Sequence, residues 1–276
     1  MAYPKLAGPK PRMLVLESQY WLDVACIRAA EAMGWSVSRT PVLMSGALPR
    51  EMVSGLLEQL VAFKPDFVLS INLSGMDEQG LFAGLFEDLH IPFVTWFVDD
   101  PRTIIMGRDC YGTEHGVALT WERGYMGYLE ERGFGLVAYM PLAVDGMVFN
   151  GEPGDSWPLP PTFIGNSMVQ SAAEEWGWAQ LHPEVESAVV EAIGRDTLAR
   201  GNFGTGLGTV LGEERIAAWD EEYRRHGELL CFVEGTRRLR EELVTRLAPH
   251  GLVVCGDEHW GRVTDAWQPY VNYEGG

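Results

Sequence analysis

The chain has 276 residues, with 21 Lys plus Arg against 39 Asp plus Glu, so its formal net charge is −18. Hydrophobic residues make up 46% and charged residues 22%, which is typical of globular domains and argues against long disordered segments. The length suits one large or two modest domains. The negative charge argues against nucleic-acid binding through neutralised phosphates, although local backbone N–H groups can still bind a nucleotide diphosphate.

The cysteine spacing and the lengths of the apolar segments indicate in which cellular compartment we expect the protein. Cys26, Cys110, Cys231 and Cys255 show no C-x-x-C pair and no zinc-ligand spacing, so we expect free thiols in a reducing cytosol and no metal. The stretch MAYPKLAGPKPR is basic but lacks the apolar run of a signal peptide. No segment approaches the roughly 20 apolar residues that cross a bilayer. We therefore expect a cytoplasmic protein without a membrane span, and its oligomeric state stays open.

The first part of the chain alternates short apolar runs with longer amphipathic stretches. Runs without polar alternation are typical of strands covered on both faces, as in a parallel sheet. The expected strands are 13–16, 36–38, 67–71, 93–98, 117–120 and 136–140. Helices are expected over 22–33, 49–63, 78–89 and 125–132. This alternation predicts a doubly wound, Rossmann-like α/β domain over residues 1–150.

The segment 151–161, GEPGDSWPLPP, is rich in Gly and Pro and predicts a linker. Beyond it, 162–167 has the pattern of a strand and a tight turn, and 252–256 that of a second strand. Helices are expected over 168–181, 183–194, 213–230 and 235–247. Residues 162–276 therefore predict a smaller, helix-rich and incomplete second α/β domain.

Several well-known motifs are missing. The residues after the first strand read ESQYWL, which is no G-x-G-x-x-G fingerprint and disfavours a dehydrogenase that binds NAD or FAD. Neither G-x-x-x-x-G-K-[ST] nor G-x-S-x-G occurs, which argues against P-loop NTPases and serine hydrolases. Gly165, Asn166 and Ser167 follow a strand and precede a helix, so their N–H groups are candidates for phosphate binding. Glycine is also common in such turns for geometric reasons alone.

Ligands of open parallel sheets bind outside the carboxyl ends of the strands. Polar or aromatic residues follow five of the expected strands, although polar loops are common there in any α/β protein. The candidate substrate-binding residues at these positions are Asn72, Ser74, Gly75, Trp121, Glu122 and Asp145.

Asp99 and Asp100 come directly after a buried strand and are followed by Pro101. Two adjacent, partly desolvated carboxylates repel each other, which raises the pKa of at least one towards the range of a general base. The alternative is structural: one Asp caps the following turn, which Pro101 opens. Spacing alone favours the structural alternative.

Three segments in this order carry a family resemblance: IPFVTWFVDDP at 91–101, YMPLAVD at 139–145 and TFIGNS at 162–167. Together they resemble the CgeB-like (spore maturation protein) family, which is grouped with the glycosyltransferases. The stretch VVCGDEHW at 253–260 is similar to that family's G-x-x-W segment. The resemblance implies a GT-B architecture, in which two Rossmann-like domains face each other across a cleft. The second domain would bind a nucleotide-sugar donor and the first an unknown acceptor, without a metal or other cofactor.

This resemblance implies two hypotheses. In the first, the chain is a GT-B glycosyltransferase or the N-terminal part of one. Asp100, or else Asp99, takes the proton of the acceptor hydroxyl, and the N–H groups near Gly165, Asn166 and Ser167 stabilise the leaving diphosphate. The family pattern continues with further strand–helix units, and the sequence ends before them. The second hypothesis is therefore a non-catalytic, GT-B-like binding or assembly protein without a complete donor site. A two-lobed small-molecule receptor is a third possibility.

Overall fold

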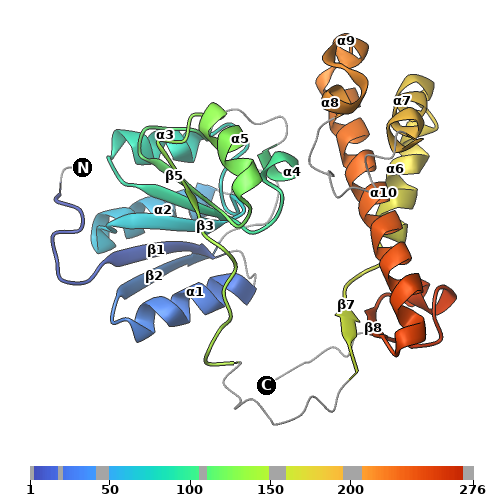
Figure 1. The fold of residues 1–276 in the computed structure, drawn as a ribbon. Coiled ribbons are helices and arrows are strands. Elements are labelled where there is room, and N and C mark those ends of the chain that lie inside the picture. The colour runs from blue at the N-terminus through green and yellow to red at the C-terminus, as the bar shows by residue number, and fades with distance from the viewer. Residues whose placement is uncertain are drawn as a thin grey trace. The chain divides into compact units, whose positions relative to one another are not determined.

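The computed structural model describes residues 3–17, 21–41, 50–105, 111–148, 160–194 and 207–269. The chain divides into two compact units, Met1–Gly151 and Glu152–Gly276 (Figure 1). Each unit has its own parallel sheet and its own hydrophobic clusters. Residues 151–159 of the predicted linker lie outside the described residues, as does Cys110. None of the described helices is long and apolar enough to cross a membrane.

Unit 1 contains a six-stranded sheet in the order β2-β1-β3-β4-β5-β6. All its neighbouring strands pair in parallel. The strands are β1 Arg12–Glu17, β2 Ser36–Pro41, β3 Phe67–Ile71, β4 Phe93–Phe97, β5 Gly116–Thr120 and β6 Leu136–Tyr139. The predicted Rossmann-like α/β fold is thereby confirmed.

The helices of unit 1 cover both faces of this sheet (Figure 1). They are α1 Trp21–Ala32, α2 Arg50–Phe63, α3 Leu81–Asp88, α4 Pro101–Ile105 and α5 Met126–Glu131. Successive side chains of a strand point to opposite faces. Leu14 and Leu16 of β1 accordingly join the cluster that includes α2 and α3 residues, while Met13 and Val15 join the cluster of α1. Burial on both faces is why β1 shows no polar alternation.

Two buried aspartates hold the ends of elements in unit 1. Asp66 accepts hydrogen bonds from the N–H groups of Leu6 and Arg12, each at 2.7 Å. Asp77 accepts from the N–H groups of Leu81, at 2.8 Å, and Phe82, at 2.7 Å. The helix expected over 78–89 begins three residues later, because its N-cap Gly80 has a φ of 71°, outside the helical region, and Asp77 then accepts the first two N–H groups of the helix.

Unit 2 contains a three-stranded parallel sheet in the order β7-β8-β9, formed by β7 Thr162–Ile164, β8 Val253–Gly256 and β9 Trp267–Pro269. Its helices are α6 Val169–Ala179, α7 Pro183–Gly194, α8 Leu207–Leu211, α9 Glu213–Ile216 and α10 Glu221–Leu247. The sequence pattern predicted only two of these strands. The smaller, helix-rich second α/β unit is confirmed.

The prediction of two separate helices, over 213–230 and 235–247, was wrong. Helix α10, Glu221–Leu247, runs through 27 residues without a break. Gly235 costs helix stability of only about 1 kcal/mol relative to Ala, and tertiary packing readily offsets that. Leu230 and Val233 of α10 pack in the cluster shared with α6 and α7. Val244, farther along the helix, packs with Val254 of β8. Helix α10 therefore joins the helices and the sheet of unit 2 into one body (Figure 1).

Candidate functional site

The carboxyl ends of β3, β4 and β5 meet at one edge of the unit 1 sheet, because these strands are parallel neighbours. Asn72 follows β3, the Asp99–Asp100 pair follows β4, and Trp121 follows β5. The structure brings two of these residues into contact, since Nδ2 of Asn72 donates to Oδ2 of Asp99 at 2.7 Å. The sequence analysis singled out Asn72 and Asp99 separately, because each follows a strand. It did not predict that the two side chains pair.

The two adjacent carboxylates are engaged by different partners. Asp99 is exposed, whereas Asp100 is 8% exposed. Oδ1 of Asp100 accepts from N and Nε of Arg102, at 3.0 and 2.8 Å, and Oδ2 accepts from Nη2 of the same residue. Burial lowers the pKa of the Arg102 guanidinium, but the hydrogen bond and charge of Asp100 outweigh this and raise that pKa. Asp100 thus has the capping geometry of the structural alternative, at the start of α4.

The other predicted residues of this edge have local contacts. Ser74 accepts from the hydroxyl of Ser70 through its main-chain oxygen at 2.9 Å, and Gly75 has a φ of 81°, so both serve the turn after β3. Oε1 of Glu122 accepts from the N–H of Gly124 at 3.1 Å and caps a short 3-10 turn.

Trp121 and Asp145 follow β5 and β6. Trp121 is 37% exposed, and its ring meets that of Tyr125 edge to face at a centroid distance of 6.1 Å. Asp145 forms an ion pair with Nη1 of Arg28 on α1 at 3.3 Å. An exposed indole at the carboxyl edge is suited to stack on a planar or sugar ligand.

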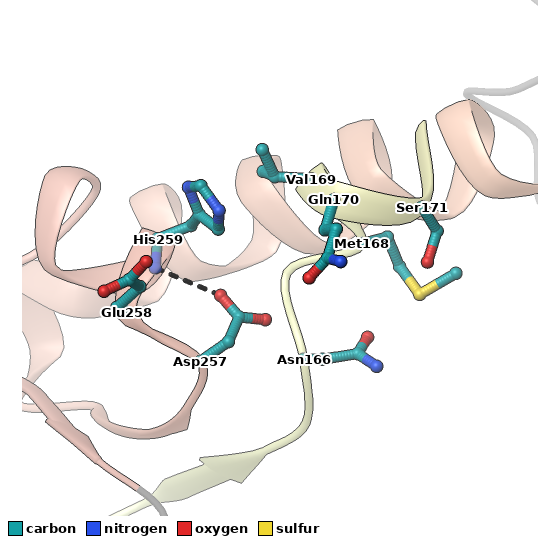
Figure 2. Close-up of a pocket in the computed structure, with 8 residues that line it drawn as sticks. All are labelled: Asn166, Met168, Val169, Gln170, Ser171, Asp257, Glu258 and His259. Carbon is teal, nitrogen blue, oxygen red and sulfur yellow. Dashed lines mark hydrogen bonds between the residues drawn. The ribbon is translucent and has the colours of Figure 1, made fainter. Parts of the chain in front are cut away.

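Unit 2 has a pocket of about 200 Å³ at the carboxyl ends of β7 and β8 (Figure 2). The first turn of α6 forms one wall and the residues after β8 form the other. The lining residues are Asn166, Met168, Val169, Gln170, Ser171, Asp257, Glu258 and His259. Sequence reasoning singled out only Asn166 among them, although the similarity of 253–260 to a family segment pointed to the same strand end.

Hydrogen bonds hold both walls of this pocket. Asp257 accepts from the N–H of Ser167 and, at 3.1 Å, from that of His259. Nη1 of Arg240 donates to the main-chain oxygen and to Oδ1 of Asn166, at 2.8 Å each. The N–H of Gly165 donates to the carbonyl oxygen of Cys255 at 3.0 Å. Two of the three N–H groups predicted to bind phosphate thus already donate within the protein, and Asn166 is the one of the three residues that lines the pocket.

Gly256 lets the end of β8 approach its surroundings closely. A Cβ atom at this position would overlap the main-chain oxygen of Gly165 and lie 2.6 Å from Cδ1 of Trp260. The indole N–H of Trp260 donates to that same oxygen at 2.8 Å. The glycine therefore allows the ends of β7 and β8 and the indole to pack closely, next in the chain to residues that line the pocket.

The described residues include no group of three or more His, Cys, Asp or Glu side chains that could hold a metal ion. The fold belongs to the class of Rossmann-like parallel α/β proteins, which host many unrelated functions. Comparison of the chain with family models, with curated proteins and with solved structures finds no match. A functional assignment therefore depends on the two strand-end regions and on the sequence motifs.

Proposed function

We propose that this protein is a glycosyltransferase that moves a sugar from a nucleotide-sugar donor to a hydroxyl group of an acceptor. Unit 2 binds the donor in the pocket beside α6, and unit 1 binds the acceptor at the carboxyl edge of its sheet. The proposal rests on the motifs shared with the CgeB-like family and on one structural observation. That observation is the pocket of unit 2, because it lies where parallel α/β sheets bind their ligands.

The lining of the unit 2 pocket suits a nucleotide sugar. Hydroxyl groups of a ribose or hexose are recognised by carboxylate and amide side chains, which Asp257, Glu258 and Asn166 supply here. The first turn of α6 lines the pocket, so the positive end of the helix dipole favours a diphosphate there. Arg240 contributes a positive charge next to Asn166.

The carboxyl edge of unit 1 suits an acceptor with several hydroxyl groups. Asn72 and Asp99 present an amide and a carboxylate there, and Trp121 adds an exposed ring. Glu122 and Asp145 add further carboxylates after β5 and β6. A carboxylate of the Asp99–Asp100 pair takes the proton of the attacking hydroxyl.

The first experiment measures donor binding. UDP-, GDP- and dTDP-sugars are titrated against the full chain while the thermal midpoint is followed, because a ligand that binds only the folded state raises that midpoint with its concentration. We expect a rise with one nucleotide class. Ser171→Phe, which fills the pocket, should abolish the rise. Ser187→Phe, on the exposed side of α7, is the matched control and should retain it. No rise with any donor would refute the proposal.

A second candidate function is a binding or assembly protein that has the fold without the chemistry. The observation that favours it is the ion pair of Asp100 with Arg102, which engages both oxygens of the carboxylate first assigned as the base. The two candidates differ in turnover. A binding protein would show the rise in thermal midpoint without release of nucleoside diphosphate, whereas a transferase would show both.

A further inference from the structure

The turn after β3 has an unusual backbone. Asn72 and Leu73 are consecutive non-glycine residues in the left-handed region, with φ values of 51° and 58°. Asn tolerates this region better than most residues, but Leu rarely adopts it. Such a conformation persists only where the surrounding structure holds it, and it is often found at functional sites.

Buried groups of β3 and β4 hold this turn. The N–H of Leu73 donates to Oγ1 of Thr95 at 3.2 Å, and the hydroxyl of Ser70 donates to the main-chain oxygen of Ser74 at 2.9 Å. Ser70 and Thr95 are both fully buried, and the Leu73 side chain packs in the main cluster of unit 1. These buried contacts therefore hold the backbone of the turn in its left-handed conformation.

The consequence is a defined orientation of the Asn72 amide. Its Oδ1 accepts from the N–H of Val98 at 2.9 Å, and this contact identifies the oxygen because the partner can only donate. Its Nδ2 therefore points to Oδ2 of Asp99, at 2.7 Å. The amide joins the backbone end of β4 to the one exposed carboxylate of the aspartate pair.

We propose that Asn72 is a positioning residue that holds Asp99, rather than Asp100, as the carboxylate presented to the acceptor. This inference rests on the proposed glycosyl transfer. As the acceptor oxygen attacks the anomeric carbon, its proton passes to the carboxylate of Asp99. The new carbon–oxygen bond forms while the bond from the anomeric carbon to the diphosphate breaks, and that electron pair leaves with the nucleoside diphosphate. Asp99 then releases the proton to solvent.

The main test variant is Asn72→Gly. Glycine adopts a positive φ without strain, so this change removes the amide while it retains the backbone of the turn. With water as the acceptor, release of nucleoside diphosphate from the donor that binds should fall at least tenfold in kcat, with KM for the donor unchanged. Asp99→Asn should lower kcat about a hundredfold or more. The thermal midpoint of Asp99→Asn should stay close to that of the wild type. Asn72→Gly should stay folded with a midpoint lowered by a few degrees, because the N–H of Val98 loses its acceptor.

Lys64→Gly is the matched control, because Lys64 is exposed, has a φ of 52° and lies before β3, at the opposite end of that strand. It should leave kcat unchanged and should not lower the thermal midpoint, because glycine adopts this φ without strain. Wild-type kcat in Asn72→Gly would overturn the role of Asn72. Loss of folding in Asn72→Gly, where Lys64→Gly folds, would likewise overturn it, because the amide would then be structural.

A second measurement is independent of turnover. The side-chain amide resonances of Asn72 in a ¹H–¹⁵N spectrum should shift in Asp99→Asn and stay in place in Lys64→Gly. Unchanged resonances in Asp99→Asn would overturn the pairing whatever the enzyme does. If no nucleotide sugar binds the wild type, the glycosyl-transfer proposal fails and the base role of Asp99 fails with it, whereas the spectrum still decides whether Asn72 orients Asp99.

Discussion

The carboxylate of Asp257 accepts the main-chain N–H of Ser167, a residue 90 positions earlier in the chain. This hydrogen bond joins the segment after β8 to the segment after β7. The same carboxylate accepts the N–H of His259, so it caps the 3-10 turn Glu258–Arg262 as well. One side chain therefore holds both walls of the unit 2 pocket.

Asp257→Ala removes the acceptor of two main-chain N–H groups. We expect a loss of about 1–3 kcal/mol in the free energy of unfolding, because the buried Ser167 and the half-buried His259 lose the charged acceptor of their N–H groups. Urea unfolding followed by tryptophan fluorescence measures this loss. Glu258→Ala changes the exposed neighbouring residue and should cost less than about 0.5 kcal/mol. Equal losses in the two variants would contradict the bridging role of Asp257.

Gly256→Ala tests the close packing of Gly256 against Gly165 and Trp260. The added Cβ would overlap the oxygen of Gly165 and press on Trp260, so we expect a destabilisation of about 3 kcal/mol. Gly177→Ala on α6 is the opposite case, since no atom lies within 4 Å of its added Cβ. That variant should stabilise the protein by about 0.5–1 kcal/mol through helix propensity. Thermal denaturation of the two variants should therefore shift in opposite directions.

Asp77→Ala removes the carboxylate that accepts the first two N–H groups of α3. Its carboxylate accepts from the N–H groups of Leu81 and Phe82, so we expect a loss of about 1–2 kcal/mol. Asp88→Ala, at the other end of the same helix, removes an exposed acidic side chain near the negative end of the helix dipole. It should be neutral or slightly stabilising. A similar loss of stability in both variants, measured by chemical denaturation, would argue against the capping role.

Glu234 on α10 predicts an acid-dependent stability. Burial raises the pKa of this carboxyl, but hydrogen bonds from Arg237 and Arg238 outweigh it and hold the pKa at about 2, below the usual 4.5. Because the pKa is lower in the folded state, Glu234 stabilises the fold above about pH 4.5 and loses this contribution as the pH falls towards 2.

Glu234→Gln should therefore destabilise the protein at pH 7 by about 1–2 kcal/mol, a value reduced for the solvent exposure of the two arginines. The difference from the wild type should shrink as the pH falls below 4.5. Glu241→Gln is the control, because Glu241 forms an exposed ion pair with Arg237 and should contribute less than about 0.5 kcal/mol. A pH-independent difference between Glu234→Gln and the wild type would contradict the ion-pair explanation.

Much of unit 1 was predictable because its central strands are buried on both faces. The run at 13–16 has no polar residue, and all four of its side chains are buried. Strand β9, in contrast, has only three residues, Trp267–Pro269, which is too short for a periodicity. The continuity of α10 was equally hidden, because Gly235 is a helix-breaking signal by propensity and a buried helix residue by packing.

The location of the candidate site at one edge of the sheet was predictable from the sequence, but the contacts between its side chains were not. The order of strands and turns put Asn72 and Asp99 at the same sheet edge, but nothing in their spacing indicated a hydrogen bond between them. We expected Asp99 and Asp100 to repel each other, and that expectation holds only if both carboxylates lie in the same surroundings. In the structure Asp100 pairs with Arg102 beneath the surface, while Asp99 is exposed beside Asn72.

The amino-acid sequence by itself determined the α/β class, the parallel sheet and the strand ends that carry polar residues, because these follow from local apolar patterns and from turn chemistry. Only the tertiary structure decided which polar groups meet: Asn72 with Asp99, Asp257 with Ser167 and Arg240 with Asn166. Hydrogen bonds between residues far apart in the chain depend on ångström-scale positions that packing sets, and local sequence patterns do not contain those positions.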